Sequence, residues 1–404
     1  MSKFFNQETF IKKYITKREE SFFAKDIANN TSQLSEQIKG KSLLVIGGAG
    51  TIGSSFIKAV IKFYPAKLTV VDYSENGLTE LTRDLRSAYN EYMPAEYLSY
   101  PFDFGGNIFK KLIANNTYDV VACFAAHKHV RSEKDHLAIE AMFRNNVVNT
   151  FNLLNALKEN PPRHIFSVST DKAANPVNVM GATKKVMEKV LLSYADRLKI
   201  STARFANVAF SNGSLLFGFN ERLAKRQPLS SPSDVKRYFV SPEESGQLCM
   251  LACMLGESSD IFFPKLYEDQ MMTFSAIAEH YLRENGMKPD YCDTAEEARL
   301  KALEWKPGSD TYPVYFFKSD TSGEKKYEEF YDDNDELNLE QYNALGVIKN
   351  TALPSSKNIK DLLEQFEILF TQDDIDKAKI IALLHKYLPD FSHIETGKNL
   401  DQKM

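Results

Sequence analysis

The chain has little cysteine, little net charge and no long apolar run, and each shortage excludes a class of protein. Its four cysteines include no C-x-x-C pair and three lie in apolar surroundings, which favours reduced thiols in a cytoplasmic protein over a disulfide framework or a zinc site. No segment reaches the roughly 18 uninterrupted apolar residues of a membrane span, and the N-terminus lacks the apolar run of a signal peptide. The formal net charge of -4 argues against nucleic acid or an anionic membrane as the main partner.

What is present is the composition of a globular protein, since 43% of the 404 residues are hydrophobic and 26% are charged. From Lys41 onward, short apolar runs alternate with amphipathic stretches, which predicts parallel strands covered by helices on both faces. We therefore expect an α/β fold with a doubly wound parallel sheet of the Rossmann type. The expected strands are Ser42 to Ile46, Leu68 to Asp72, Tyr97 to Tyr100, Val120 to Phe124, His164 to Val168 and Ser201 to Phe205. The expected helices are Gly53 to Phe63, Asn76 to Glu91, Ile139 to Glu159 and Met180 to Leu198.

The pattern divides the chain into segments. Residues 1–40 carry aromatic and aliphatic side chains at helical spacing, and we expect a helical preface that packs on the main domain. Residues 41–206 form the expected dinucleotide-binding domain. Residues 207–309 are punctuated by prolines and form the expected smaller, substrate-binding lobe, which can share strands with the main sheet.

The last segment, residues 310–404, has two parts. Residues 310–350 are polar and acidic, which is typical of a solvated excursion. Residues 358–388 return to helical periodicity and are expected to form two short helices docked on the body.

Three glycines with G-x-x-G-x-x-G spacing, Gly47, Gly50 and Gly53, follow the first expected strand and open the next helix. Each has a mechanical reason in a dinucleotide site: a tight turn, close approach of the backbone to a pyrophosphate, and close helix-to-strand packing. We expect this turn, with Thr51 and Ile52, to bind the cofactor.

Further cofactor contacts are expected along the carboxyl ends of the strands. Asp72 lies about 20 residues beyond the last glycine, where a carboxylate accepts hydrogen bonds from an adenosine ribose and repels a 2′-phosphate, so NAD is favoured over NADP. Asp103 and Phe104 stand where adenine is usually held, although Asp103 is alternatively a simple turn residue. Ala125 and Ala126 end a strand with side chains small enough for a cofactor to lie across it.

A polar cluster, Thr170, Asp171 and Lys172, follows the fifth expected strand, and the chain then turns into a helix that carries Met180 and Lys184. Because ligands gather at the carboxyl ends of strands in open α/β sheets, this cluster is a candidate active site. The alternative is a loop in which Thr170 and Asp171 only cap the next helix.

Three longer motifs contain or follow this cluster: Ser169-Thr-Asp-Lys-Ala, Asn178-Val-Met-Gly-Ala-Thr-Lys and Arg237-Tyr-Phe-Val-Ser. With the glycine spacing they resemble the extended short-chain dehydrogenase/reductases, and more narrowly the 4,6-dehydratases that act on UDP-N-acetylglucosamine. The resemblance runs from about Phe22 to about Ile277. It implies a UDP-sugar substrate, an NAD that stays bound, and a homo-oligomer paired through the helices that begin near Ile139 and Met180.

The resemblance assigns roles to the polar cluster. Met180 stands where the wider superfamily has the tyrosine of Tyr-x-x-x-Lys, and a thioether has no proton to exchange. The base for the sugar C4 hydroxyl is therefore expected to be Thr170 with Asp171, or a water they hold, while Lys184 holds and polarises the cofactor. Lys172 stands where dehydratases of thymidine-diphosphate glucose have glutamate, so it is the expected base at C5, with Asp171 as the acid at C6. Alternatively, Lys172 pairs with a substrate phosphate.

For the substrate, the resemblance implies contacts from Lys128, His129, Asn207 and Arg237, of which Arg237 is alternatively an ordinary surface cation. No metal site is expected, because no third ligand lies at useful spacing from His127 and His129, the two histidines that follow the fourth expected strand. Two other functions stay open: an epimerase or dehydratase of another nucleotide sugar, and a non-catalytic NAD-binding regulator that has lost the tyrosine.

Overall fold

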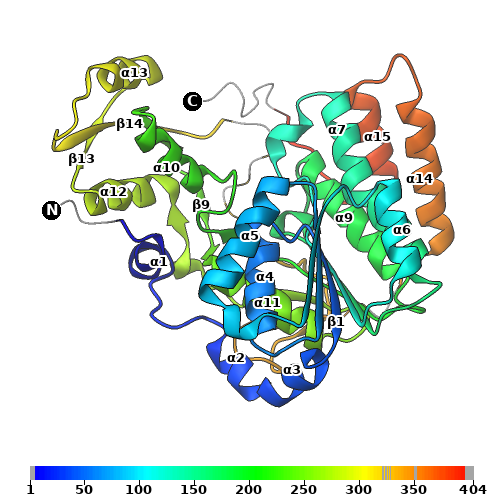
Figure 1. Ribbon diagram of the computed structural model, residues 1–404. Coiled ribbons are helices and arrows are strands. Elements are labelled where there is room, and N and C mark those ends of the chain that lie inside the picture. Colours follow the sequence, from blue (N-terminus) through cyan, green and yellow to red (C-terminus); the bar gives the residue numbers. More distant parts are fainter. Residues whose placement is uncertain are drawn as a thin grey trace.

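The main body is one large sheet covered by helices on both faces (Figure 1). The computed structural model describes residues 5–320, 323, 325, 327, 329–349 and 353–395. The strands of the main sheet in this part of the chain are β1 (Ser42–Ile46), β2 (Lys67–Asp72), β3 (Glu96–Pro101), β4 (Val120–Cys123), β5 (His164–Val168), β6 (Ile200–Ala203), β11 (Ile261–Pro264), β15 (Leu337–Asn338) and β16 (Leu345–Ile348).

The strand order is β15-β16-β11-β6-β5-β4-β1-β2-β3, and the pairs between β11 and β3 are all parallel. Beyond β11, β16 and β15 continue the sheet in antiparallel register. Each strand expected from the sequence is present, with ends within two residues of the expected ones. The doubly wound α/β fold is therefore confirmed.

Helices cover the two faces because each presents an apolar stripe to the strands. The first face carries α4 (Thr51–Ile61), α5 (Glu75–Ala88) and α11 (Pro242–Leu255). The second carries α6 (Asn107–Asn115), α7 (His136–Phe143), α8 (Asn149–Leu157) and α9 (Val179–Leu192). The single helix expected from Ile139 to Glu159 is interrupted, since a π-helical turn at Arg144–Val148 separates α7 from α8. The helix expected to reach Leu198 ends at Leu192, where turns follow.

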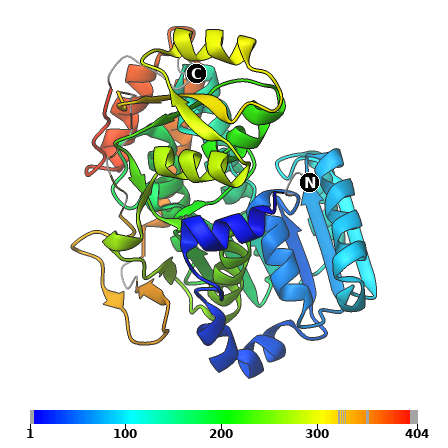
Figure 2. The ribbon, with the colours of Figure 1, turned by 90° about the vertical axis from the view of Figure 1, so that its left-hand side faces the viewer.

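The N-terminal preface is helical, as predicted, but it packs on two bodies. It contains α1 (Gln7–Phe10), a π-helical turn (Ile11–Thr16), α2 (Ala24–Asn29) and α3 (Thr31–Ile38). The side chains of α3 join the core of the main sheet, whereas Phe10 and Ile11 join the core of the small lobe. Figure 2 shows this segment, in dark blue, passing between the small lobe and the main body.

The small lobe is built on a three-stranded parallel sheet. Its strands are β8 (Leu229–Pro232), β14 (Thr311–Phe317) and β13 (Lys288–Tyr291), and its helices are α10 (Leu215–Ala224), α12 (Phe274–Glu284) and α13 (Ala295–Glu304). Two short ladders join it to the body: β7 (Asn207–Val208) with β10 (Phe239–Val240), and β9 (Lys236–Arg237) with β12 (Met272–Thr273).

The expectation that residues 310–350 are a solvated excursion is wrong for two stretches. Tyr312 and Val314 are fully buried at the centre of the small-lobe sheet, and β16 is buried against β11. The acidic run between these strands dominates the composition and hides their apolar pattern. Because β11 and β16 both extend the main sheet, segments 207–309 and 310–404 share it with segment 41–206, and the domain boundaries themselves stay a prediction.

The C-terminal helices, α14 (Ser356–Phe370) and α15 (Lys377–Tyr387), confirm the two helices predicted within 358–388. They pack on α7 and α9: the rings of Phe143 and Phe366 stack at 4.1 Å, and the Arg144 guanidinium donates to both oxygens of Glu367. The helices expected to pair subunits are thus covered by the chain's own C-terminal helices. The homo-oligomer stays a prediction, but this face no longer supports it.

The burial of Phe366 predicts a large stability effect. Phe366→Ala should lower the free energy of unfolding by about 3–5 kcal/mol, because it removes a fully buried ring and leaves a cavity against Phe143. Urea unfolding followed by circular dichroism measures the change. Ile368→Ala, in the same helix but 56% exposed, is the control and should change it by less than about 0.5 kcal/mol. An equal loss in both variants would contradict the docking of α14.

The cysteines Cys123, Cys249, Cys253 and Cys292 are all buried and free, in accord with reduced thiols. Burial raises the pKa of Cys123 to about 11, so its thiol is protonated at neutral pH. In the described part of the chain, no helix combines the length and the apolar character that a membrane span requires.

Candidate active site

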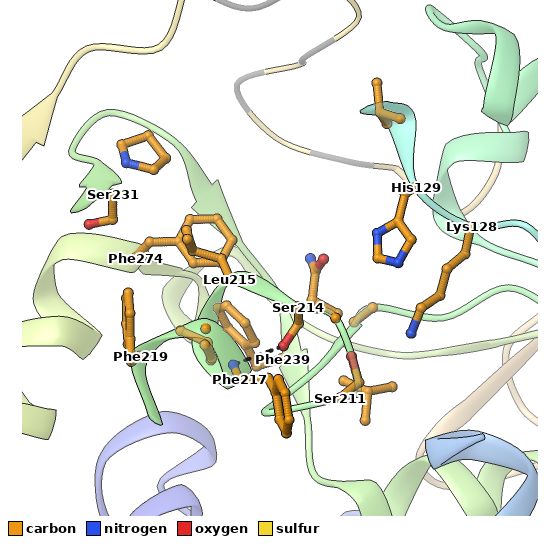
Figure 3. A pocket seen from close by; sticks show the side chains of 18 of the residues that line it. Lys128, His129, Ser211, Ser214, Leu215, Phe217, Phe219, Ser231, Phe239 and Phe274 are labelled. Carbon is orange, nitrogen blue, oxygen red and sulfur yellow. Dashed lines mark hydrogen bonds between the residues drawn. The ribbon is translucent and has the colours of Figure 1, made fainter. Parts of the chain in front are cut away.

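A cavity of about 980 Å³ lies where the carboxyl ends of the central strands face the small lobe. One wall comes from the segments after β4, β5 and β6, and includes Phe124, Val168 and Phe205. The other comes from α10, β8 and the segments beside them. Figure 3 shows Lys128 and His129 on one side, with Ser211 and Ser214 facing them from the loop before α10.

Thr170, Asp171 and Lys172 lie together on the cavity wall, in a short 3-10 turn after β5. The Asp171 carboxylate is buried, and its Oδ1 accepts hydrogen bonds from the Thr170 hydroxyl at 2.8 Å and the Lys172 ammonium at 3.1 Å. The Thr170 hydroxyl caps the 3-10 turn Asp171–Ala173, whereas helix α9 is capped by Asn178, so the capping alternative is confirmed for Thr170 at the turn and is wrong for α9. Along these hydrogen bonds, a proton on one group can pass to the next.

Met180 and Lys184 lie one turn apart on α9 and also line the cavity. Both are buried, and the Lys184 Nζ donates to the backbone oxygen of Val168 at 2.8 Å. Desolvation lowers the pKa of Lys184 from 10.5 to about 8, which still leaves it mostly protonated at neutral pH. The structure therefore places a cation and a thioether in the same cavity lining as the polar cluster.

A buried ion pair behind the cluster holds α9 against the sheet. The Arg204 guanidinium donates to both carboxylate oxygens of Glu188, at 2.9 and 2.8 Å, and the Ser169 hydroxyl donates to the same carboxylate at 2.6 Å. Arg204 and Glu188 are each at most 2% exposed, and the arginine keeps the pKa of Glu188 below its usual value although burial opposes this. Glu188 was not predicted from the sequence. The signal was Arg204, a charged residue at the end of an apolar strand, which needs a buried partner.

The glycine turn has the shape of a dinucleotide site. Gly47 has φ +76°, and a Cβ there would lie 2.4 Å from the Ala125 nitrogen, while a Cβ at Gly53 would lie 2.3 Å from the Gly47 oxygen. Side chains are thus excluded where the backbone must approach a pyrophosphate. The Asp72 carboxylate accepts from the Ala49 amide at 3.0 Å, so it lies beside the turn. Gly50 is the N-cap residue of α4, which directs that helix terminus to the same place.

The other expected cofactor residues are spread around this turn. Ile52 and Ala126 line the cavity, and the Thr51 hydroxyl accepts from the Asn212 amide at 2.9 Å. Asp103 is exposed and its carboxylate accepts from the Gly105 amide, which fits the turn-residue alternative. Phe104 is buried in the core against α6, so its role at an adenine stays a prediction.

Of the expected substrate residues, Lys128, His129 and Asn207 line the cavity. The protein around Lys128 partly desolvates it and lowers the pKa of its ammonium. Arg237 is not among the lining residues; it is 5% exposed and its Nη1 donates to the Lys236 oxygen. The alternative that Arg237 is a surface cation is therefore wrong, and its contact with a substrate stays a prediction.

The small-lobe end of the cavity contains candidate binding residues that were not predicted from the sequence. Ser230 and Ser231 are buried there, and their hydroxyls have no hydrogen-bond partner among the described residues. Arg222, Lys225 and Arg299 line the same end. Buried hydroxyls without a partner suit a hydrogen-bonding ligand, and the charged groups of the lining have both signs, since Glu221 also lines the cavity and accepts from the Lys225 ammonium at 2.6 Å. The sequence pattern did not indicate Ser230 and Ser231 as binding residues, because β8 has the pattern of an ordinary short strand.

Glu133 is a second missed residue, and it predicts a pH effect on stability. It is 5% exposed and its Oε2 accepts from the Val179 amide, at the start of α9, at 2.5 Å. Burial raises the pKa of Glu133 from 4.5 to about 7, against a smaller opposing effect of Lys377. The neutral form of Glu133 contributes up to about 3 kcal/mol to the free energy of unfolding. This contribution is complete below pH 4.5 and is lost as the pH rises through about 7.

Glu133→Gln should therefore flatten the stability profile between about pH 4.5 and 7, since the amide carries no charge at any pH. Thermal unfolding across this range measures it. Glu304→Gln, at an exposed position of α13, is the control and should keep the wild-type profile. If the wild-type slope persisted in Glu133→Gln, another group would be responsible.

Comparison with known proteins shows the family of this chain. The family model described as "Polysaccharide biosynthesis protein" matches residues 43–349, which is most of the chain. The chain belongs to this family. The proteins similar to it include an uncharacterized membrane protein of Methanocaldococcus jannaschii, which is 30% identical, with 87% of this chain and 97% of the relative covered. The capsular polysaccharide biosynthesis protein CapD of Staphylococcus aureus is 29% identical over 74% of this chain, which spans about half of CapD (49%).

More distant relatives have named activities. A UDP-N-acetylglucosamine 4,6-dehydratase (inverting) of Campylobacter jejuni is 27% identical, with 56% of this chain and 67% of the relative covered. A UDP-glucose 4-epimerase of Rickettsia bellii is also 27% identical, with 56% of this chain and 66% of the relative covered. Among solved structures, Pen from Bacillus thuringiensis superposes with a TM-score of 0.63 at 20% identity, covering 87% of this chain and 98% of Pen. At that identity the likeness shows the shared fold.

Proposed function

We propose that this protein is a 4,6-dehydratase that uses NAD to convert UDP-N-acetylglucosamine to a UDP-4-keto-6-deoxy-N-acetylhexosamine. The observation that carries the proposal is the hydrogen-bonded pair of Asp171 and Lys172, an acid and a base side by side on the wall of a cavity. Lys184 and Met180 lie on the same wall, so the cavity offers proton transfer at two sugar carbons without a tyrosine. The sequence relatives that bear this activity support the substrate class.

The proposed cycle requires Asp171 to be ionised and Lys172 to be neutral when the sugar reacts. A bound NAD, which the glycine turn, Asp72 and Lys184 would hold, would supply hydride chemistry at C4 and C6 with no net redox change. The C4 hydroxyl proton passes to Asp171 through the Thr170 hydroxyl, along the 2.8 Å hydrogen bond between them. The ketone acidifies the C5 proton, which Lys172 removes.

Asp171 then gives its proton to the C6 hydroxyl, which leaves as water when the C6–O bond breaks. Lys172 returns its proton to C5 as the hydride reaches C6. One water is lost and both side chains end in their starting states. Retention of the intermediates requires a site shielded from solvent, and the cavity between the sheet and the small lobe is partly enclosed.

The test is to incubate the purified protein with UDP-N-acetylglucosamine, with and without added NAD, and to look by mass spectrometry for loss of one water. NADP in place of NAD should support less turnover, because the Asp72 carboxylate repels a 2′-phosphate. If another nucleotide sugar lost water and UDP-N-acetylglucosamine did not, the assigned substrate would be wrong. No change in any nucleotide sugar would favour the NAD-binding regulator.

A 4-epimerase is the second candidate, since UDP-glucose 4-epimerases are among the relatives. Epimerisation at C4 needs no base at C5, so it leaves Lys172 without a role. A product of unchanged mass but altered configuration at C4, identified by NMR, would favour the epimerase. The cytoplasmic location and the homo-oligomer stay predictions.

A further inference from the structure

Phe210 has an unusual backbone for a bulky residue. Its φ is +54°, in the left-handed region that disfavours side chains with a Cβ, and its ring is 3% exposed. It begins the loop between β7 and α10. Such a conformation persists when the surrounding structure holds it in place, and it is typical of functional sites.

Two aromatic residues from distant parts of the chain hold the Phe210 ring. The Phe10 ring, at the end of α1, meets it edge-on with 5.9 Å between centroids, and Tyr281 of α12 lies at 6.3 Å. Phe10 and Tyr281 are themselves buried and in contact with each other at 6.0 Å. Figure 2 shows the N-terminal segment, in dark blue, crossing between the small lobe and the body.

The loop that Phe210 begins connects the two halves of the candidate active site. The Asn212 amide donates to the Thr51 hydroxyl at 2.9 Å, at the start of the helix that follows the glycine turn. Gly213, with φ +74°, packs so closely that a Cβ there would lie 3.0 Å from the His129 imidazole. Ser211 and Ser214 line the cavity itself. One short loop therefore touches the expected cofactor turn, the expected substrate loop and the cavity.

We propose that Phe210 is a positioning residue and that Phe10 braces it, so that the N-terminal segment holds the 210–214 loop closed over the cofactor and the sugar. The inference rests on the proposed function, which needs the cofactor and the sugar intermediates to stay bound through a cycle without net redox change. A glycine at position 210 would adopt this backbone without strain but would give Phe10 nothing to hold. The ring is thus what couples the loop to the N-terminal helix.

The test compares Phe10→Leu with Phe5→Leu. Phe5 packs against the same cluster, with ring centroids 5.5 Å from Phe10 and 5.2 Å from Tyr281, so both variants make the same chemical change in one segment. Phe10→Leu should raise the Kd for NAD and the KM for UDP-N-acetylglucosamine by about tenfold, while kcat changes little, because the 210–214 loop is no longer held closed over the cofactor and the sugar. Phe5→Leu should leave both constants near wild type. Phe210→Gly, which removes the ring and keeps the allowed backbone, should match Phe10→Leu.

Thermal unfolding shows that each variant is folded at the assay temperature. Equal shifts in Phe10→Leu and Phe5→Leu, or wild-type constants in both Phe10→Leu and Phe210→Gly, would overturn the brace. The NAD measurement needs no turnover. A wild-type protein without dehydratase activity would therefore defeat the proposed function, while the Kd for NAD would still decide the brace.

Discussion

Lys172→Gln should abolish dehydration, with turnover lower by about 10²–10⁴-fold, the usual contribution of a positioned general base. The Lys172 ammonium lies 3.1 Å from Asp171 on the cavity wall, and glutamine can keep a hydrogen bond to that carboxylate but cannot take the C5 proton. Mass spectrometry of the product measures water loss. NMR in deuterated water measures exchange at C5, which should disappear in this variant.

Two further variants distinguish the role of the acid from that of the base, and loss of the catalytic base from simple loss of a positive charge. Asp171→Asn should slow water loss, because it removes the proton donor at C6 while Lys172 remains. Lys185→Gln makes the same charge change on α9, at a residue that lines a smaller pocket rather than the main cavity, and should keep wild-type turnover. Near-normal water loss in Lys172→Gln would show that this lysine is not the base and would favour its pairing with a substrate phosphate.

Lys184→Met should also be severe, with turnover lower by about 10²–10³-fold, the scale expected when a preorganised donor beside the reacting atoms is removed. Its Nζ donates to Val168 and lies at the wall of the cavity, beside the expected nicotinamide ribose. We expect NAD affinity to fall with turnover. Calorimetric titration with NAD and the water-loss assay measure the two effects.

The melting temperature separates this role from a structural one. Burial has lowered the pKa of Lys184 to about 8, so its charge is costly in the fold, and removing it offsets the lost hydrogen bond to Val168. Little change in melting temperature with a large loss of activity is therefore expected. Lys189→Met, on the same helix and bonded instead to the Tyr387 oxygen, is the control for a lysine-to-methionine change. Full activity in Lys184→Met would remove the lysine from the mechanism.

Local pattern was enough to predict most of the sheet and the chemistry at its edge. A buried parallel strand is a continuous apolar run, so β1 and β5 were expected with their observed ends. The glycine turn and the cluster from Thr170 to Lys184 follow such strands directly, and a parallel sheet brings the carboxyl ends of its strands to one edge. Sequence reasoning therefore found one wall of the cavity.

The opposite wall depends on contacts between segments far apart in the chain. Ser231 comes from a strand of the small lobe, and its unpaired hydroxyl is visible only once that lobe faces the sheet. Strand β16 was missed because the acidic run before it masks an apolar stretch that pairs with β11, more than eighty residues earlier. No local spacing encodes such pairings.

The sequence by itself determined the fold class, the glycine turn and the identity of the polar cluster, because each depends on residues close together in the chain. The tertiary structure alone decided that Asp171 and Lys172 share a hydrogen bond, that Glu133 is buried at the start of α9, and that α14 covers the face of α7. It also decided that Phe10 reaches Phe210 across two hundred residues. Burial and long-range contact set these features, and both arise only when the chain has folded.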